Sequence, residues 1–184
     1  MNISLGIRTH SGWAAIVAAG QHEGEWTIIA RERLSMVDDA YAKAPYHAAE
    51  NLSPEEARSL VDSAFTHIRE VSYRNLRALV TRLHDSGHSI QGCAVLTGAP
   101  MPAWTTDEIL AVHFRMHKAE GVLFQQQALR AAEDCGLTAI AVPEKQLKID
   151  AAFMAALGKK FGPPWGADQK SALAAIIAAY HDQR

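Results

Sequence analysis

The sequence predicts a mixed α/β fold, in which a five-stranded sheet of three antiparallel strands and then two parallel strands carries helices on both faces. Short apolar runs separated by glycine turns fill the first part of the 184-residue chain. Two further apolar runs, 90–96 and 137–142, are separated by a long segment with helical spacing. Strands that are joined through a helix run parallel and are buried on both faces, so these two runs predict the parallel part of the sheet.

The three antiparallel strands are expected at 3–7, 13–19 and 26–34, with turns that contain Gly12 and Gly24. Apolar residues alternate with other residues in the third run, which is typical of a strand with one buried face. The residues expected on that one face are Trp26, Ile28, Ala30 and Leu34.

Residues 35–52 lack a clear period and predict a long inserted loop with at most a short helical turn, a kind of segment that is often functional. Ser53-Pro54-Glu55-Glu56 is a capping box, and the apolar spacing that follows predicts a long helix over 54–86. A second capping box at Thr105 begins a helix that we expect to continue to about Asp134.

Two helices are expected in the last part of the chain, over about 144–157 and from Ala167 to His181. The segment Gly162-Pro163-Pro164-Trp165-Gly166 separates them, because neither glycine nor two successive prolines continue a helix.

Composition narrows the possible classes of protein. The length predicts a single domain over 1–184, and a formal net charge of -2 gives no overall attraction to nucleic acid, although a local basic patch remains compatible with it. Cys93 and Cys135 lie in apolar contexts and are predicted to be free, buried thiols in a reducing cytosol. The chain has no secretory signal and no apolar stretch long enough to span a bilayer, so we expect a cytoplasmic protein without a membrane partner.

Three motifs resemble those of one family. Ser4-Leu5-Gly6-Ile7-Arg8 is similar to an opening strand I-L-G-I-D, and Asp168-Gln169-Lys170-Ser171-Ala172-Leu173-Ala174 is similar to a terminal D-x-x-D-A-L-A. Between them, Lys118-Ala119-Glu120-Gly121-Val122 resembles the family's middle helix. Because these three motifs follow one another in the family's order, the chain resembles the RuvC-type Holliday-junction resolvases of the ribonuclease H-like superfamily. The resemblance implies a ribonuclease H-like sheet, a nucleic-acid partner and a divalent metal ion held by carboxylates.

The chain departs from this family at the metal-binding positions. Arg8 stands where the first strand carries Asp, Thr97 stands where Glu is expected, and Ser171 replaces the last Asp of the D-x-x-D pair. Two-metal chemistry needs clustered oxygen ligands, and an arginine keeps its positive charge, so it repels a cation but can contact a phosphate with two hydrogen bonds. The sequence therefore predicts a RuvC-like homologue with a degenerate, non-nucleolytic site that binds phosphate or a nucleic-acid backbone.

The candidate residues of this altered site come from the two ends of the chain. Arg8, His10 and Asp168 are the candidate residues at the position of the family's catalytic site. His10 is expected in the first hairpin turn, where it would hold an anion or donate a proton. A plain polar turn is the alternative for His10. Further ligand contacts are predicted at Thr97, Lys170 and Ser171.

Two other functions stay open. His113 and His117, four residues apart on one helix face with Glu120 one turn further on, can form a transition-metal site, and with Asp168 they would give a metal-dependent nuclease or hydrolase. The alternative for the two histidines is that they are ordinary half-exposed residues of a surface helix. The second open function is that of a non-catalytic scaffold that forms a homodimer through the helix 54–86.

Overall fold

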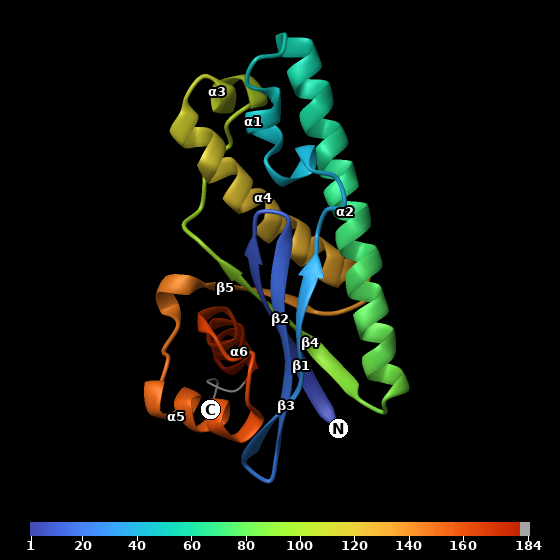
Figure 1. Ribbon diagram of the computed structural model, residues 1–184, viewed down its shortest axis with the longest axis vertical. Coiled ribbons are helices and arrows are strands. Elements are labelled where there is room, and N and C mark those ends of the chain that lie inside the picture. The colour runs from blue at the N-terminus through green and yellow to red at the C-terminus, as the bar shows by residue number, and fades with distance from the viewer. Residues whose placement is uncertain (181–184) are drawn as a thin grey trace.

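A mixed five-stranded sheet organises the molecule, for which the computed structural model describes residues 1–180. The strand order is β3-β2-β1-β4-β5, so the first strand lies at the centre (Figure 1). The first three strands pair antiparallel, whereas β4 runs parallel to β1 and β5 runs parallel to β4. This order and these directions confirm the predicted ribonuclease H-like sheet. The strands are β1 (Asn2–His10), β2 (Trp13–His22), β3 (Glu25–Ser35), β4 (Ser89–Thr97) and β5 (Ala139–Pro143).

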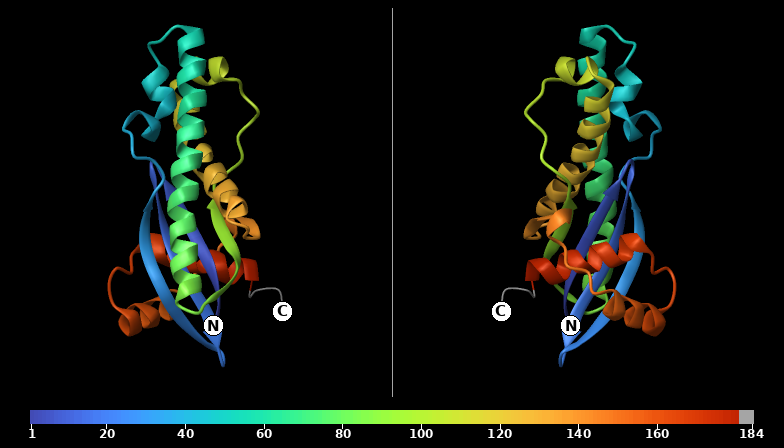
Figure 2. Two further views of the ribbon diagram at one scale, coloured as in Figure 1. Left: turned by 90° about the vertical axis from the view of Figure 1, so that its right-hand side faces the viewer. Right: turned by 90° about the vertical axis from the view of Figure 1, so that its left-hand side faces the viewer.

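Helices cover both faces of the sheet, as the sequence predicts (Figure 2). One face packs against α2 (Pro54–Asp85) and α4 (His113–Asp134), and the other against α6 (Ala167–Tyr180), with α5 (Ala151–Phe161) beside it. Alternate residues of β1 therefore face opposite layers of the core. Within residues 1–180, no helix combines the length and the hydrophobicity needed to cross a membrane. The predicted helix end at His181 lies outside the described residues.

Close packing of α6 on β1 depends on Gly6. A Cβ atom at this position would lie 2.0 Å from the backbone oxygen of Ala172, a distance that no real Cβ contact reaches. The absence of a side chain at Gly6 thus lets the backbone of α6 approach the central strand directly. This contact places the first turn of α6, which carries Asp168, near the carboxyl end of β1.

A bulge in β3 corrects the predicted face pattern of that strand. Ala18 of β2 pairs with Ala30, but the next residue, Ala19, pairs with Ile28, so Ile29 is the extra residue. One inserted residue reverses the faces of all side chains beyond it. Accordingly, Trp26 and Ile28 pack in the α6 layer, whereas the residues after the bulge pack in the α2 and α4 layer, and the four apolar residues do not share one face.

Two helix predictions need correction. The helix expected over 105–134 is divided at Val112, whose extended backbone (φ -142°, ψ 113°) separates α3 (Thr106–Leu110) from α4. The helix expected over about 144–157 begins later, because the Asp150 carboxylate accepts hydrogen bonds from the backbone N–H groups of Ala152 and Phe153 and caps α5 there. Glu144 instead lies in a single 3-10 turn, η2 (Glu144–Gln146), directly after β5.

The predicted inserted loop 35–52 is packed against the body of the molecule. It contains a 3-10 turn, η1 (Tyr41–Lys43), and a short helix, α1 (Pro45–Ala49), which contacts both α2 and α4. The buried side chains of this segment are Met36, Val37, Ala42, Pro45, Tyr46 and Ala49. These contacts fix α1 in position, so its polar residues can take part in a preorganised site.

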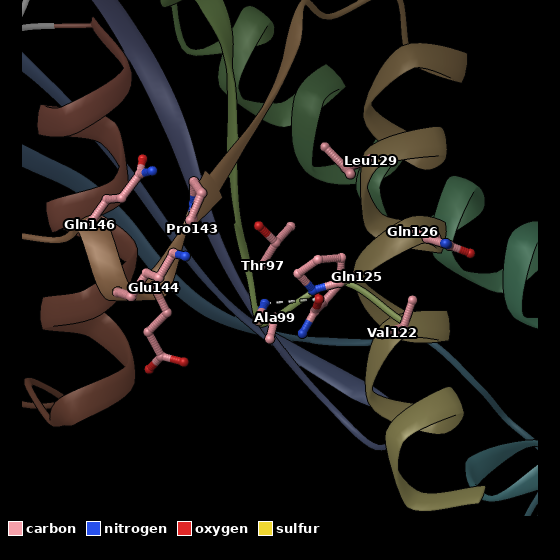
Figure 3. Close-up of a pocket in the computed structure, with 12 residues that line it drawn as sticks. Thr97, Ala99, Val122, Gln125, Gln126, Leu129, Pro143, Glu144 and Gln146 are labelled. Atoms are coloured by element: carbon pink, nitrogen blue, oxygen red, sulfur yellow. Dashed lines mark hydrogen bonds between the residues drawn. The ribbon is translucent and has the colours of Figure 1, made fainter. Parts of the chain in front are cut away.

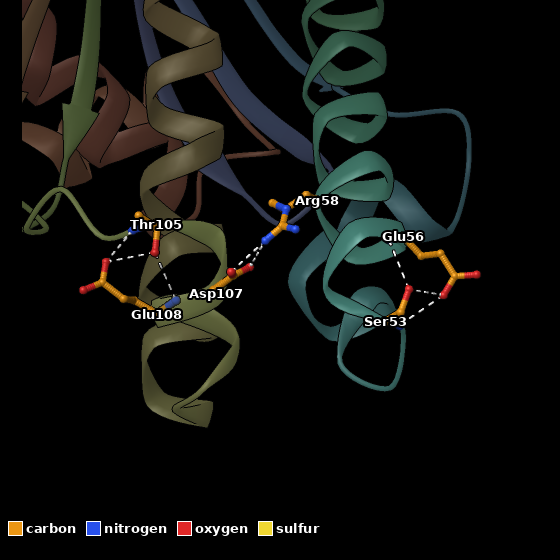
Figure 4. Close-up of polar contacts among 6 residues, drawn as sticks. All are labelled: Ser53, Glu56, Arg58, Thr105, Asp107 and Glu108. Atoms are coloured by element: carbon orange, nitrogen blue, oxygen red, sulfur yellow. Dashed lines mark hydrogen bonds and ion pairs between the residues drawn. The ribbon is translucent and has the colours of Figure 1, made fainter.

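Both predicted capping boxes are present (Figure 4). The Ser53 and Thr105 side chains accept hydrogen bonds from the backbone N–H groups three residues later, while Glu56 and Glu108 accept from the capping residues. Arg58 of α2 also reaches the Asp107 carboxylate of α3, with Nη1 2.7 Å and 3.0 Å from its two oxygens. The start of α3 is thereby attached to α2.

Candidate functional site

Arg8, His10, Glu144 and Asp168 form one cluster of polar, ionisable side chains, here named the Arg8 cluster, at the carboxyl ends of β1 and β5. Nε of Arg8 lies 3.1 Å from Oδ1 of Asp168, and Nη1 lies 2.5 Å from Oε1 of Glu144. One guanidinium therefore bridges two carboxylates that come from different elements. The predicted meeting of Arg8 and Asp168 in space is confirmed, while the roles proposed for them stay predictions.

His10 extends the cluster from the end of β1. It lies on the strand, paired with Trp13, and not in the turn that the sequence predicts, because β1 continues to His10 before the turn at Ser11 and Gly12. The ring stacks on Trp13 with 4.2 Å between centroids. Its Nε2 is 3.1 Å from Oδ1 of Asp168, but the two atoms are not aligned as a hydrogen bond.

The Arg8 cluster does not fit a divalent metal ion of the kind that the family resemblance implies. Two carboxylates and an imidazole are suitable ligand types, but the guanidinium of Arg8 lies against both carboxylates. Arginine does not lose its proton in proteins, so a fixed positive charge holds the position that a cation would need. A metal ion could enter only after Arg8 had left both partners.

Two adjoining cavities open beside the cluster. The smaller, of about 170 Å³, is lined by Arg8 and Glu144, and the larger, of about 750 Å³, extends from it between β5 and α4. Both are lined by Thr97 and Gln125, whose Oε1 accepts a hydrogen bond of 3.1 Å from the backbone N–H of Gly98. In Figure 3, Glu144 and Gln146 lie on one side of the larger cavity, and Gln125, Gln126 and Leu129 of α4 lie on the other.

The predicted ligand contacts are only partly brought together. Thr97 lies on the rim of both cavities, at the end of a parallel strand where ligands bind in open α/β sheets. Lys170 and Ser171 follow Asp168 on α6, half-buried, and line neither cavity. The sequence prediction missed Glu144, which the same rule could have found, because it directly follows the last parallel strand.

A second cluster lies where α1 contacts the first turns of α4, and we name it the histidine cluster: His47, His113 and His117. One ligand nitrogen from each ring lies within 4.8 Å of the others. The Nε2 atoms of His113 and His117 are 3.1 Å apart, which confirms that this predicted pair meets on one helix face. His47 was missed as a member, since a single histidine in a segment without a clear sequence period has no spacing that reveals its partners.

Glu120 supports His47 and does not point at the other two rings. Its Oε1 lies 2.9 Å from Nδ1 of His47 and 3.3 Å from the backbone N–H of the same residue. Glu120 is only 5% exposed, an unusual burial for a carboxylate. Burial raises the pKa of the neighbouring Tyr46 hydroxyl to about 12, and the negative charges of Glu120 and Asp62 add to the rise.

The four residues of the predicted metal-dependent alternative are divided between two places. Asp168 contacts Arg8 and His10, whereas His113 and His117 contact His47. Along α4, the rise of 1.5 Å per residue puts Gln125 of the cavity about 12 Å beyond His117. A single site that uses Asp168 together with the histidines is therefore not formed.

No protein-family model matches the chain, and no curated protein matches it. Among solved structures, the fold is similar to Thermus thermophilus RuvC in complex with a Holliday junction substrate, with a TM-score of 0.49 and 13% identity over 96% of this chain and 91% of that chain. It is also similar to another structure of Thermus thermophilus RuvC, with a TM-score of 0.48 and 12% identity over 95% of this chain and 91% of that chain. At these identities the similarity concerns the fold alone.

Proposed function

We propose that the chain binds the phosphate backbone of nucleic acid at the Arg8 cluster and the adjoining cavities, and that it does not hydrolyse it. The observation that carries the proposal is the position of the Arg8 guanidinium between Glu144 and Asp168. A guanidinium supplies the positive charge that a phosphate needs, but it does not activate water as a metal ion does.

Exchange of one anion for another on Arg8 is the proposed binding event. The Glu144 side chain is 54% exposed and belongs to a single 3-10 turn, so it can leave Arg8 at low cost. A phosphate group that replaces it offers two oxygens to the planar guanidinium, the geometry in which arginine binds most strongly. Asp168 remains paired with Arg8 and keeps the guanidinium oriented.

The walls of the cavities supply further contacts to a nucleic-acid strand. Lys145 lines the larger cavity, and Lys118 lies on its rim, where Nζ is 3.2 Å from the carbonyl oxygen of Ala99. These two ammonium groups are a local basic feature on a chain whose net charge is -2. The amides of Gln125, Gln126 and Gln146 offer donors and acceptors to the edge of an unpaired base.

Salt-dependent binding tests the proposal directly. The similar Thermus protein was solved with a Holliday junction, so a fluorescent four-way junction is the first probe, with duplex and single-stranded DNA beside it. The logarithm of the affinity falls as the logarithm of the salt concentration rises, and each lost phosphate contact makes this slope less steep by about 1. We expect this reduction in slope for Arg8→Gln and for Lys145→Ala. Lys160→Ala, which breaks a surface pair with Glu25 away from the cavities, should leave the slope unchanged.

Two results would contradict the proposed function. One is affinity for all three DNA forms that does not change with salt or with Arg8→Gln. The other is cleavage of any of them in Mg²⁺ or Mn²⁺ that Asp168→Asn abolishes, because such cleavage would require the metal centre that Arg8 opposes. Circular dichroism of each variant establishes that it is folded.

A location in the reducing cytoplasm is part of the same proposal. Cys93 and Cys135 are free and buried, as a protein of a reducing compartment allows, and a cytoplasmic location fits a nucleic-acid partner. Homodimer formation through α2 also stays a proposal.

A further inference from the structure

The geometry points to a transition-metal site formed by His47, His113 and His117, which binds Zn²⁺ and leaves one coordination position open. This site is separate from the Arg8 cluster and does not depend on the proposed function. It joins α1, in the segment 35–52, to the first two turns of α4.

The distances between the rings suit a metal ion. Tetrahedral Zn²⁺ with Zn–N bonds of 2.0–2.1 Å requires ligand nitrogens about 3.4 Å apart. The Nε2 atoms of His113 and His117 are 3.1 Å apart, and a nitrogen of His47 lies within 4.8 Å of both. Small rotations of the rings about their side-chain bonds are enough to bring the three nitrogens into that geometry, since His113 and His117 are exposed.

Glu120 gives a second reason that is independent of histidine spacing. Its buried carboxylate lies 2.9 Å from Nδ1 of His47, and because a carboxylate accepts hydrogen bonds, Nδ1 is assigned the N–H that donates to it. The lone pair of the His47 ring is then on Nε2, the nitrogen left for a metal ion. A carboxylate behind a ligating histidine is the usual support of zinc sites, where it fixes the tautomer and the orientation of the ring.

The ligand set determines which ions bind. Three neutral imidazoles favour Zn²⁺ and other late first-row ions over Mg²⁺ or Ca²⁺, which prefer oxygen ligands. Three protein ligands are one fewer than a closed structural zinc site has, so a water molecule completes the tetrahedron. The exposed side of His113 and His117 gives the ion and this water access from solvent.

Metal titration of tag-free protein tests the inference. We expect one Zn²⁺ per chain, and we expect Co²⁺ in its place to give the intense visible absorption of four-coordinate cobalt. His113→Ala and His117→Ala change exposed residues and should leave the fold intact, but each should weaken Zn²⁺ binding about 100-fold or more. His22→Ala removes an exposed histidine of the β2 end and serves as the matched control, with unchanged binding.

His47→Ala and Glu120→Gln distinguish a built site from a chance pair of surface histidines. His47→Ala should weaken Zn²⁺ binding as strongly as the α4 variants, and Glu120→Gln should weaken it by about 10- to 100-fold. The inference is overturned by binding that His47→Ala leaves unchanged, by a weak six-coordinate cobalt spectrum, or by no binding at micromolar Zn²⁺. None of these measurements involves nucleic acid, so their outcome is independent of the Arg8 cluster.

Discussion

At the scale of single residues, Arg8 determines the chemistry of the central cluster. Its guanidinium contacts Glu144 and Asp168, so two negative charges face one positive charge that does not titrate. The Arg8 and Asp168 side chains are each 28% exposed, and water screens their attraction only in part. Removal of Arg8 therefore leaves two carboxylates that repel each other, and this repulsion is what a cation could relieve.

Arg8→Asp is expected to create a divalent-metal site. Three carboxylates would then converge where one guanidinium lies now, which is a ligand set for Mg²⁺ or Mn²⁺. The variant should unfold at a lower temperature than the wild type in EDTA and regain stability when Mn²⁺ is added, as followed by thermal unfolding. Arg8→Ala is the comparison, because it removes the same positive charge without adding a ligand and should therefore gain less stability from Mn²⁺. If the melting temperature of Arg8→Asp does not change when Mn²⁺ is added, the three carboxylates do not bind one ion together.

The thiols of Cys93 and Cys135 should be unreactive in the folded protein. Burial raises the pKa of Cys93 to about 12, and burial also raises the pKa of Cys135, so neither forms the reactive thiolate near neutral pH. We expect no reaction with a disulfide reagent such as DTNB at pH 8, and two equivalents of reaction in guanidinium chloride. Rapid labelling of the native protein would mean that this part of the core opens.

Sequence alone identified some residues of both clusters and missed others for a physical reason. The motif at Arg8 and the spacing of His113 and His117 are local patterns, and the structure bears out where they lie. His47 lies in the short helix α1 and Glu144 in the 3-10 turn η2, so the spacing within their own segments does not show the partners that folding brings to them. The position of Glu144 directly after a parallel strand was a usable signal, whereas nothing comparable points to His47.

At the scale of elements, the contact of α6 with β1 positions Asp168. Gly6→Ala should be strongly destabilising, by about 3 kcal/mol or more, because its Cβ would overlap the backbone oxygen of Ala172 and force α6 away from the strand. Urea unfolding measures the loss. The control is Gly121→Ala on the exposed side of α4, where nothing lies within 4 Å and a gain of about 0.5–1 kcal/mol is expected. Equal stability of Gly6→Ala and the wild type would show that α6 is not held at this distance.

The capping boxes should make stability depend on pH in the acid range. Hydrogen bonds from Ser53 lower the pKa of Glu56, and hydrogen bonds from Thr105 lower the pKa of Glu108. A lowered folded pKa stabilises the protein above the unfolded pKa, about 4.3 for Glu, and this contribution disappears as the pH falls through the folded pKa. The double variant Glu56→Gln/Glu108→Gln should therefore be less stable than the wild type at pH 7. Urea unfolding at pH 3 should show a smaller difference, and a difference that does not shrink would contradict the prediction.

The predicted elements differ from the observed ones mainly at irregularities. The order of strands and helices follows from periods in the sequence, and it is correct. The bulge at Ile29 depends on pairing across the sheet, the break at Val112 is a change of backbone conformation, and the start of α5 at Ala151 is set by the Asp150 cap. Apolar periodicity records none of these three features, although the Asp150 cap is a local signal that the sequence does contain.

At the scale of the whole molecule, the helix α4 carries groups of both candidate sites. The histidine cluster is at its first turns, and the larger cavity lies beside its middle. The two sites thus share one rigid element while they face different surroundings. Measurements of DNA affinity with and without Zn²⁺ report whether ordering one end of α4 alters the other.

Self-association through α2 is the remaining whole-molecule prediction. Within residues 1–180, α2 exposes one large apolar side chain, Tyr73, at 38%. If α2 forms the homodimer interface, Tyr73→Glu should convert the dimer into a monomer in sedimentation velocity at micromolar concentration, because it buries a charge in the interface. Asp85→Asn at the end of α2 is a surface control. An oligomeric state that Tyr73→Glu leaves unchanged would place any interface elsewhere.

The contact of α6 with Gly6 has an evolutionary consequence. Since backbone atoms set the distance between this helix and the central strand, position 168 stays opposite position 8 whatever side chains the two carry. A lineage could then exchange a metal-dependent centre for a metal-free one, or return to it, by substitutions at a few codons and without rebuilding its scaffold. Loss and recovery of an activity would be separated by a short mutational path.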